Sequence, residues 1–126
     1  MPDQIKIDWT SIRREAPFPQ EAFQFVREGL AHTVQTFHGD GVSTTERHVS
    51  GPQLCIGLRD YAIQTYGMLA RTVLSRWGIK STVDFGRIVF AMIEAGLMRK
   101  SEEDTIEDFQ NVYDFEEAFA AAEALA

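Results

Sequence analysis

Residues 81–98 read STVDFGRIVFAMIEAGLM and carry the clearest helical pattern in the chain. Apolar side chains recur there at spacings of three and four, which is typical of one buried helix face. This stripe consists of Phe85, Ile88, Val89, Met92 and Ile93. Ser81 and Asp84 have the spacing of an N-terminal capping box, and Gly96 is suited to the left-handed turn that follows many helices. The stretch therefore predicts a helix that lies against a core.

The same spacing predicts further helices on both sides of this one. Apolar periodicity indicates a helix over residues 19–37, another over 51–66 and a short one from 69 to 77. Ser50, with glutamine three residues later, forms a capping box at the start of 51–66. An alanine-rich helix is expected over 114–125, opened by an aspartate with glutamate three residues later.

A β-hairpin is predicted between the last two helices. Residues 97–100 and 109–113 flank the polar run 101–108, an arrangement typical of two strands and a long turn. The order of short helix, turn, longer helix and hairpin is that of a winged helix. We therefore expect a mainly α fold with a small β-hairpin (α+β), winged-helix-like.

Length and composition indicate a single domain, residues 1–126, with 44% hydrophobic and 25% charged residues. Within it, residues 1–18 lead into a helical core, 19–100, and 101–126 form the acidic hairpin and C-terminal helix. No run approaches the roughly 18 apolar residues of a membrane span, and the N-terminal residues lack the apolar core of a signal peptide. With one cysteine, Cys55, no internal disulfide can form. We expect a cytoplasmic protein without a cofactor.

The net charge of −7 is unevenly distributed along the chain. Residues 1–100 hold all 12 basic and 10 acidic side chains, whereas residues 101–126 hold nine acidic side chains and no basic one. Such a block repels phosphate and attracts a basic partner. The simpler interpretation is a solvated acidic edge that aids solubility.

A nucleic-acid-associated regulator is one function that the predicted fold allows. The cations it would use are Arg71, Arg76, Lys80, Arg87, Arg99 and Lys100. A recognition helix needs cations or carboxamides on its exposed face. The predicted helix offers Arg87 against Asp84 and Glu94. The acidic block beside this modest basic patch disfavours direct binding to a duplex.

A small metal-binding protein or an enzyme is a further alternative. His38, Asp40, Glu46 and His48 fall within eleven residues and offer donors suited to Zn²⁺ or Mn²⁺. Their spacing matches no metal motif, so solvent-facing polar groups are the simpler interpretation. Cys55 lies one turn inside a predicted helix beside its apolar stripe, which indicates a buried structural thiol. The pattern gives catalysis no positive support, and a non-enzymatic role is favoured.

The leading hypothesis is therefore a protein–protein interaction or adaptor module. Ile56 and Ile63 lie off the main stripe of their helix, and with Phe25 they would form an apolar patch if exposed. Glu102, Glu103 and Asp104 would supply acidic contacts. The partner would be a basic protein or a second copy of the chain.

Three stretches of the sequence also carry a family resemblance. They are HVSGPQLCIGLRDYA at 48–62, TVLSRWGIKSTVDFGRIVFAMIEAGLM at 72–98 and EDFQNVYDFEEAF at 107–119. Together they resemble an uncharacterised family of small bacterial proteins found mainly in Planctomycetes and Verrucomicrobia, over roughly residues 20–119. The resemblance implies a bacterial, cytoplasmic, stand-alone protein. It transfers no activity, substrate or site residue.

Overall fold

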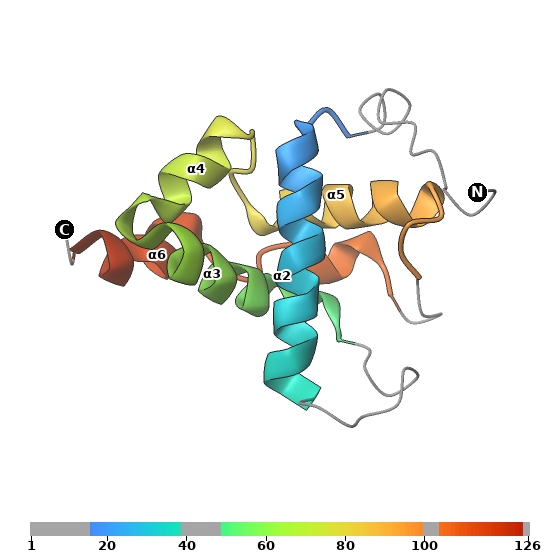
Figure 1. Cartoon of the computed structure of the whole chain (residues 1–126), viewed down its shortest axis with the longest axis horizontal. Helices are drawn as coiled ribbons and strands as arrows, with labels where there is room; N and C mark the ends of the chain where they lie inside the picture. Colours follow the sequence, from blue (N-terminus) through green and yellow to red (C-terminus); the bar gives the residue numbers. More distant parts are fainter. Residues whose placement is uncertain (1–15, 39–48, 100–103, 125–126) are drawn as a thin grey trace, which may run out of the picture.

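The computed structural model describes residues 16–38, 49–99 and 104–124, and every regular element in these ranges is helical (Figure 1). The elements are α2 (Gln20–His38), α3 (Gly51–Tyr66), the 3₁₀ turn η2 (Gly67–Leu69), α4 (Ala70–Arg76), α5 (Thr82–Glu94), the 3₁₀ turn η3 (Ile106–Phe109) and α6 (Phe115–Ala124). The predicted helices are thus confirmed, and most of their described ends lie within one or two residues of the predicted ends. Helix α2 crosses and contacts both α3 and α5, and α6 packs against α3 and α4 (Figure 1).

Side-chain caps set where α3 and α5 begin, as predicted. The Gln53 amide donates to Ser50 Oγ at 3.2 Å, and the Ser50 amide donates back to Gln53 Oε1 at 2.9 Å. At α5, Asp84 Oδ2 accepts from the amides of Lys80 at 2.8 Å and Ser81 at 3.3 Å. These bonds satisfy amides that the first turn of a helix leaves without intrahelical partners.

Gly78 ends α4 and directs the following residue into the core. Its φ of +87° lies in the left-handed region that glycine adopts without strain. The Gly78 amide donates to Ser75 O at 2.9 Å and the Ile79 amide donates to Leu74 O at 2.9 Å, which is the hydrogen-bond pattern of a Schellman motif. Leu74 and Ile79 are fully buried. The turn therefore fixes the corner at which α4 gives way to α5.

One core joins all the long helices. Its fully buried members include Phe23 and Val26 of α2, Leu58 of α3, Ile88 and Met92 of α5, and Phe119 of α6. Burial of each such side chain contributes roughly 1.5–3 kcal/mol. Because Phe119 belongs to this core, the acidic C-terminal helix is part of the same packed unit.

The backbones of α2 and α3 approach closely through two glycines. A Cβ at Gly57 would overlap Thr33 Oγ1 and lie 2.6 Å from Thr33 Cβ, and a Cβ at Gly29 would overlap Leu58. The Thr33 hydroxyl donates to Gly29 O at 2.7 Å and so needs no other partner in the buried contact. Packing therefore requires glycine at position 57, whereas at position 29 the overlapping atom is the flexible end of the Leu58 side chain.

The predicted β-hairpin is wrong, and the winged-helix-like expectation that depended on it is wrong as well. In the described parts of 97–113 there is no strand, and residues 106–109 form η3. The Thr105 amide donates to Asp108 Oδ2 at 3.0 Å, which caps this turn. Phe109, at 3% exposure, packs against Gly86, where a Cβ would lie 2.7 Å from its ring.

A threonine of α5 supplies the hydrogen bonds that a partner strand would otherwise provide. Thr82 Oγ1 donates to Phe109 O at 2.6 Å and accepts from the Val112 amide at 3.2 Å. Buried backbone groups need a partner, and here one hydroxyl serves two of them. Residues 109–112 are therefore held to the start of α5 without a sheet.

None of the described helices has the length and apolarity needed to cross a membrane.

Candidate interaction surface

A groove runs along the corner between α4 and α5 and faces residues 110–116. It consists of two adjoining hollows of about 570 Å³ and about 580 Å³, which share Lys80, Asp114 and Phe115. We call it the corner groove. The three lining residues that the hollows have in common show that the two hollows adjoin.

The first hollow has walls of opposite charge. Arg71, Arg76 and Lys80 line it from α4 and the corner, and Asp114 and Glu116 line it from the start of α6. Arg71 Nε lies 3.0 Å from Glu123 Oε2, in a pair about one-third exposed. The exposed side chains of Arg76 and Lys80 form no ion pair with any described residue. Within the described part of the chain, Arg76 and Lys80 are thus not neutralised by an ion pair.

The second hollow is lined by polar side chains and backbone bends. Ser81 and Thr82 contribute from the start of α5, and Gln110 and Asn111 contribute from the segment after η3. Asn111 has a φ of +53°, a left-handed conformation that asparagine tolerates better than most residues. The Thr82 hydrogen bonds hold this segment against α5, and so fix the width of the groove.

A second surface feature lies on η2, the segment that directly precedes α4. Met68 is 51% exposed and Leu69 is 54% exposed, although both are large apolar side chains. We call this pair the η2 surface. Gly67, with a φ of +56°, ends α3 and starts the turn, and η2 contacts α6. Phe37, at 42% exposure, is the other large apolar side chain exposed in the described ranges, at the far end of α2.

The apolar patch expected from Phe25, Ile56 and Ile63 does not form. Phe25 is 3% exposed, and its ring centroid lies 5.5 Å from that of Tyr61 and 5.6 Å from that of Trp77. Ile56 and Ile63 are half-buried, and Ile63 packs against the core. Phe25 is therefore a core residue, because α3 and the end of α4 cover a second side of α2.

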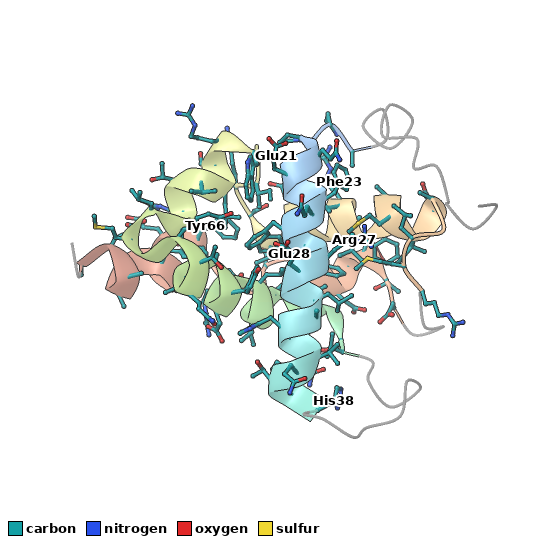
Figure 2. The ribbon with its side chains drawn as sticks, viewed as in Figure 1. Glu21, Phe23, Arg27, Glu28, His38 and Tyr66 are labelled. Carbon is teal, nitrogen blue, oxygen red and sulfur yellow. The ribbon has the colours of Figure 1, made fainter. Side chains whose placement is uncertain are left out.

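Of the other residues proposed for partner or metal contacts, the structure describes Asp104 and His38. Asp104 is half-buried, whereas Glu102 and Glu103 lie outside the described residues. His38 is half-buried at the end of α2 (Figure 2), and Asp40, Glu46 and His48 lie outside the described residues. Within the described ranges no three His, Cys, Asp or Glu side chains are grouped to hold a metal ion.

The structure brings together three of the six cations considered for nucleic acid. Arg71, Arg76 and Lys80 meet at the corner groove. Arg87 lies elsewhere: its Nη1 is 3.3 Å from Asp84 Oδ1 and its guanidinium stacks over the Phe18 ring at 5.2 Å. Arg99 is exposed beyond the end of α5, and Lys100 lies outside the described residues.

The predicted burial of Cys55 is confirmed. Its side chain is fully buried, and burial raises the pKa of the thiol to about 12. The Tyr113 hydroxyl donates to Cys55 O at 2.6 Å, and burial raises the pKa of that hydroxyl well above its ordinary value. Both groups therefore stay protonated at neutral pH and act in packing and hydrogen bonding.

The sequence pattern had not identified the η2 surface. Leu69 shares helical spacing with Val73 and Trp77, a pattern that favours a buried face. The signal that could have found it is Gly67, since a positive-φ glycine interrupts the helix and changes the direction in which the next side chains point.

The groove and the η2 surface lie on consecutive segments, because Leu69 precedes α4 directly and both η2 and α4 contact α6. Comparisons with protein-family models, with curated proteins and with solved structures find no match.

Proposed function

We propose that the chain is a non-enzymatic protein-interaction module that binds a partner protein through the η2 surface. The observation that carries this proposal is the exposure of two consecutive large apolar side chains, Met68 at 51% and Leu69 at 54%. Removing the remaining exposed area of each from water would contribute about 1 kcal/mol. Methionine and arginine are enriched at protein interfaces, and the neighbouring Arg71–Glu123 pair supplies a polar rim.

The η2 surface is anchored, which lowers the cost of binding. Ala70 and Leu74, which follow the turn, are 1% and 0% exposed, and η2 also contacts α6. A turn held from both sides presents its side chains without further ordering of the backbone. Less conformational entropy is then lost when a partner binds.

The proposed setting is the bacterial cytoplasm. The resemblance of residues 20–119 to small bacterial proteins supports this, and a single buried thiol at Cys55 suits a reducing compartment. The partner is proposed to be another protein or a second copy of the chain. The opposite charges that line the corner groove argue against a duplex nucleic acid as the partner.

Affinity capture from the native lysate tests the proposal. The tagged chain, Met68→Ser/Leu69→Ser and the control Phe37→Ser are each used with and without nuclease, and the captured proteins are identified by mass spectrometry. Phe37→Ser removes an exposed apolar side chain from a different part of the molecule. We expect a stoichiometric protein that survives nuclease, stays with Phe37→Ser and is lost with Met68→Ser/Leu69→Ser.

Two results would count against the proposal. A partner retained equally by all three chains would show that the η2 surface does not bind it. Capture that disappears with nuclease would identify a nucleic acid as the primary contact. Light scattering on the purified chain separates self-association from binding of a different protein.

A further inference from the structure

We propose that the corner groove binds an extended acidic peptide segment of the partner protein. The inference rests on the proposed function in one respect, namely that the partner is a protein. It adds a second contact site and the chemistry of the segment that occupies it.

The shape of the groove suits an extended chain. Its two hollows, about 570 Å³ and about 580 Å³, are joined through Lys80, Asp114 and Phe115. Ile79 and Phe115, at 0% and 7% exposure, form an apolar base. Small-molecule sites usually enclose most of their occupant. Two adjoining open hollows instead fit several consecutive residues of a peptide.

The charges select acidic side chains on one side of that peptide. Arg76 and Lys80 are exposed and have no ion-pair partner among the described residues, and Arg71 continues the same wall. Carboxylates placed against these cations form charge-assisted hydrogen bonds, which are stronger than neutral ones. Because the Arg71–Glu123 pair is partly exposed, a peptide carboxylate can also reach Arg71.

The opposite wall favours a peptide over a nucleic acid. Asp114 and Glu116 line the same hollow as the cations and would repel an unbroken phosphate backbone. An extended peptide turns alternate side chains to opposite sides, so its carboxylates can face α4 while neutral side chains face α6. The carboxamides of Gln110 and Asn111 and the hydroxyl of Ser81 can pair with peptide N–H and C=O groups.

The η2 surface and the groove can contact one partner together. Leu69 is followed directly by α4, and Arg71 of α4 is the first cation of the groove. A partner that covers Met68 and Leu69 therefore has the basic wall within reach of an adjoining segment. Two linked contacts raise affinity beyond either one alone.

The test is a fluorescence-polarisation titration of the purified full chain. The probes are a labelled ten-residue peptide of alternating glutamate and valine, a matched lysine–valine peptide and a ten-nucleotide oligothymidine. The variant Arg76→Glu/Lys80→Glu removes the available cations. The control Arg27→Glu/Arg99→Glu makes the same change in net charge at exposed positions outside the groove, with Arg27 on α2 (Figure 2).

We expect the glutamate peptide to bind saturably, and Arg76→Glu/Lys80→Glu to weaken it at least about tenfold, because two charge pairs are reversed. The control variant should weaken it by less than about threefold, since charges away from the groove act only through a screened field. In wild-type chain, peptide-induced shifts of backbone NMR signals should concentrate at Ser75, Lys80 and Asn111. This second measurement serves even if the double variant fails to fold.

Three outcomes would overturn the inference. They are no saturable binding of the glutamate peptide, equal weakening by the two double variants, and tighter binding of oligothymidine than of the peptide. If any of these occurs while Met68→Ser/Leu69→Ser still loses a captured protein, the proposed function stands and the acidic segment alone is refuted. If the peptide binds as expected but no protein depends on the η2 surface, the proposed function fails by itself.

Discussion

Thr82→Val is expected to destabilise the chain by about 3–4 kcal/mol. Thr82 is 1% exposed, and its hydroxyl joins α5 to the segment that lines the second half of the corner groove. It donates to Phe109 O at 2.6 Å and accepts from the Val112 amide at 3.2 Å. Valine keeps the shape of threonine but can neither donate nor accept. The substitution therefore isolates the two hydrogen bonds from packing.

The magnitude follows from where the two backbone partners lie. An unsatisfied buried donor or acceptor costs about 1–3 kcal/mol. Phe109 is 3% exposed, so its carbonyl is placed at the upper end of that range. Val112 is half-buried, so its amide can regain part of the lost bond from water and is placed near the lower end. The sum of the two gives the expected loss.

Urea unfolding followed by circular dichroism measures this loss, with Thr82→Ser as the matched control. Serine retains the hydroxyl and loses one methyl group, which should cost about 1 kcal/mol. Thr82→Val should therefore be clearly the less stable variant. Equal losses for the two variants, or a loss below about 1 kcal/mol for valine, would refute the assignment of the hydroxyl as the tie that holds residues 109–112.

Three further substitutions examine the packing. Gly57→Ala adds a Cβ that overlaps Thr33, so it should lower the free energy of unfolding in urea by a net of about 2 kcal/mol, despite a gain of about 1 kcal/mol in helix propensity. In a Thr33→Gly background the same change should stabilise the chain. A neutral result in wild type would contradict the close approach of the two helices. Tyr113→Phe removes the 2.6 Å bond to Cys55 O and should cost about 1 kcal/mol at neutral pH; no loss would show that water replaces the bond. Burial raises the pKa of the Cys55 thiol from 9.0 to about 12, so the folded chain holds a proton that the unfolded chain loses above pH 9.0. This contribution to stability is complete below pH 9.0 and is lost as the pH rises to about 12. Stability should fall by about 1.4 kcal/mol per pH unit in that window, and Cys55→Ala should remove this part of the slope; an unchanged slope would contradict it.

The parts of the fold that the sequence predicted are those that local interactions determine. The Ser50–Gln53 capping box lies within four consecutive residues, and the glycine turns after α4 and α5 depend on a single backbone conformation. Between these signals, the helical periodicity of the apolar residues predicts the helices themselves. Such features do not depend on how the rest of the chain packs, so their positions were predictable within one or two residues.

The parts that were wrong depend on contacts between distant residues. Residues 109–113 follow a polar run as the second strand of a hairpin would, but Thr82, 27 residues before Phe109, binds this backbone in place of a partner strand. Phe25 lies off the main stripe of α2, yet Tyr61 and Trp77 from other helices cover it. A sequence pattern shows which faces are apolar but does not show how many neighbours surround a helix.

The same limit applies to the candidate site. Arg71, Arg76 and Lys80 belong to the larger set of cations that was predicted to form a modest basic patch, and these three do line one hollow. What the sequence could not show is that Asp114 and Glu116, more than thirty residues away, line the same hollow. The partners of a charge are set by tertiary packing, whereas its sign is known from the sequence alone.

The position of α6 changes the interpretation of the uneven charge along the chain. In sequence, the C-terminal acidic block is separate from the basic residues and would be expected to repel phosphate or recruit a basic partner. In the structure, Glu123 pairs with Arg71 at 3.0 Å, and the start of α6 lies across the groove from Arg76 and Lys80. Some carboxylates of the acidic block therefore lie beside the basic residues of the groove in the same molecule. A continuous polyanion in the groove would lie against the carboxylates of α6, whereas the separate acidic side chains of a peptide can face away from them. The position of α6 therefore favours a peptide in this groove.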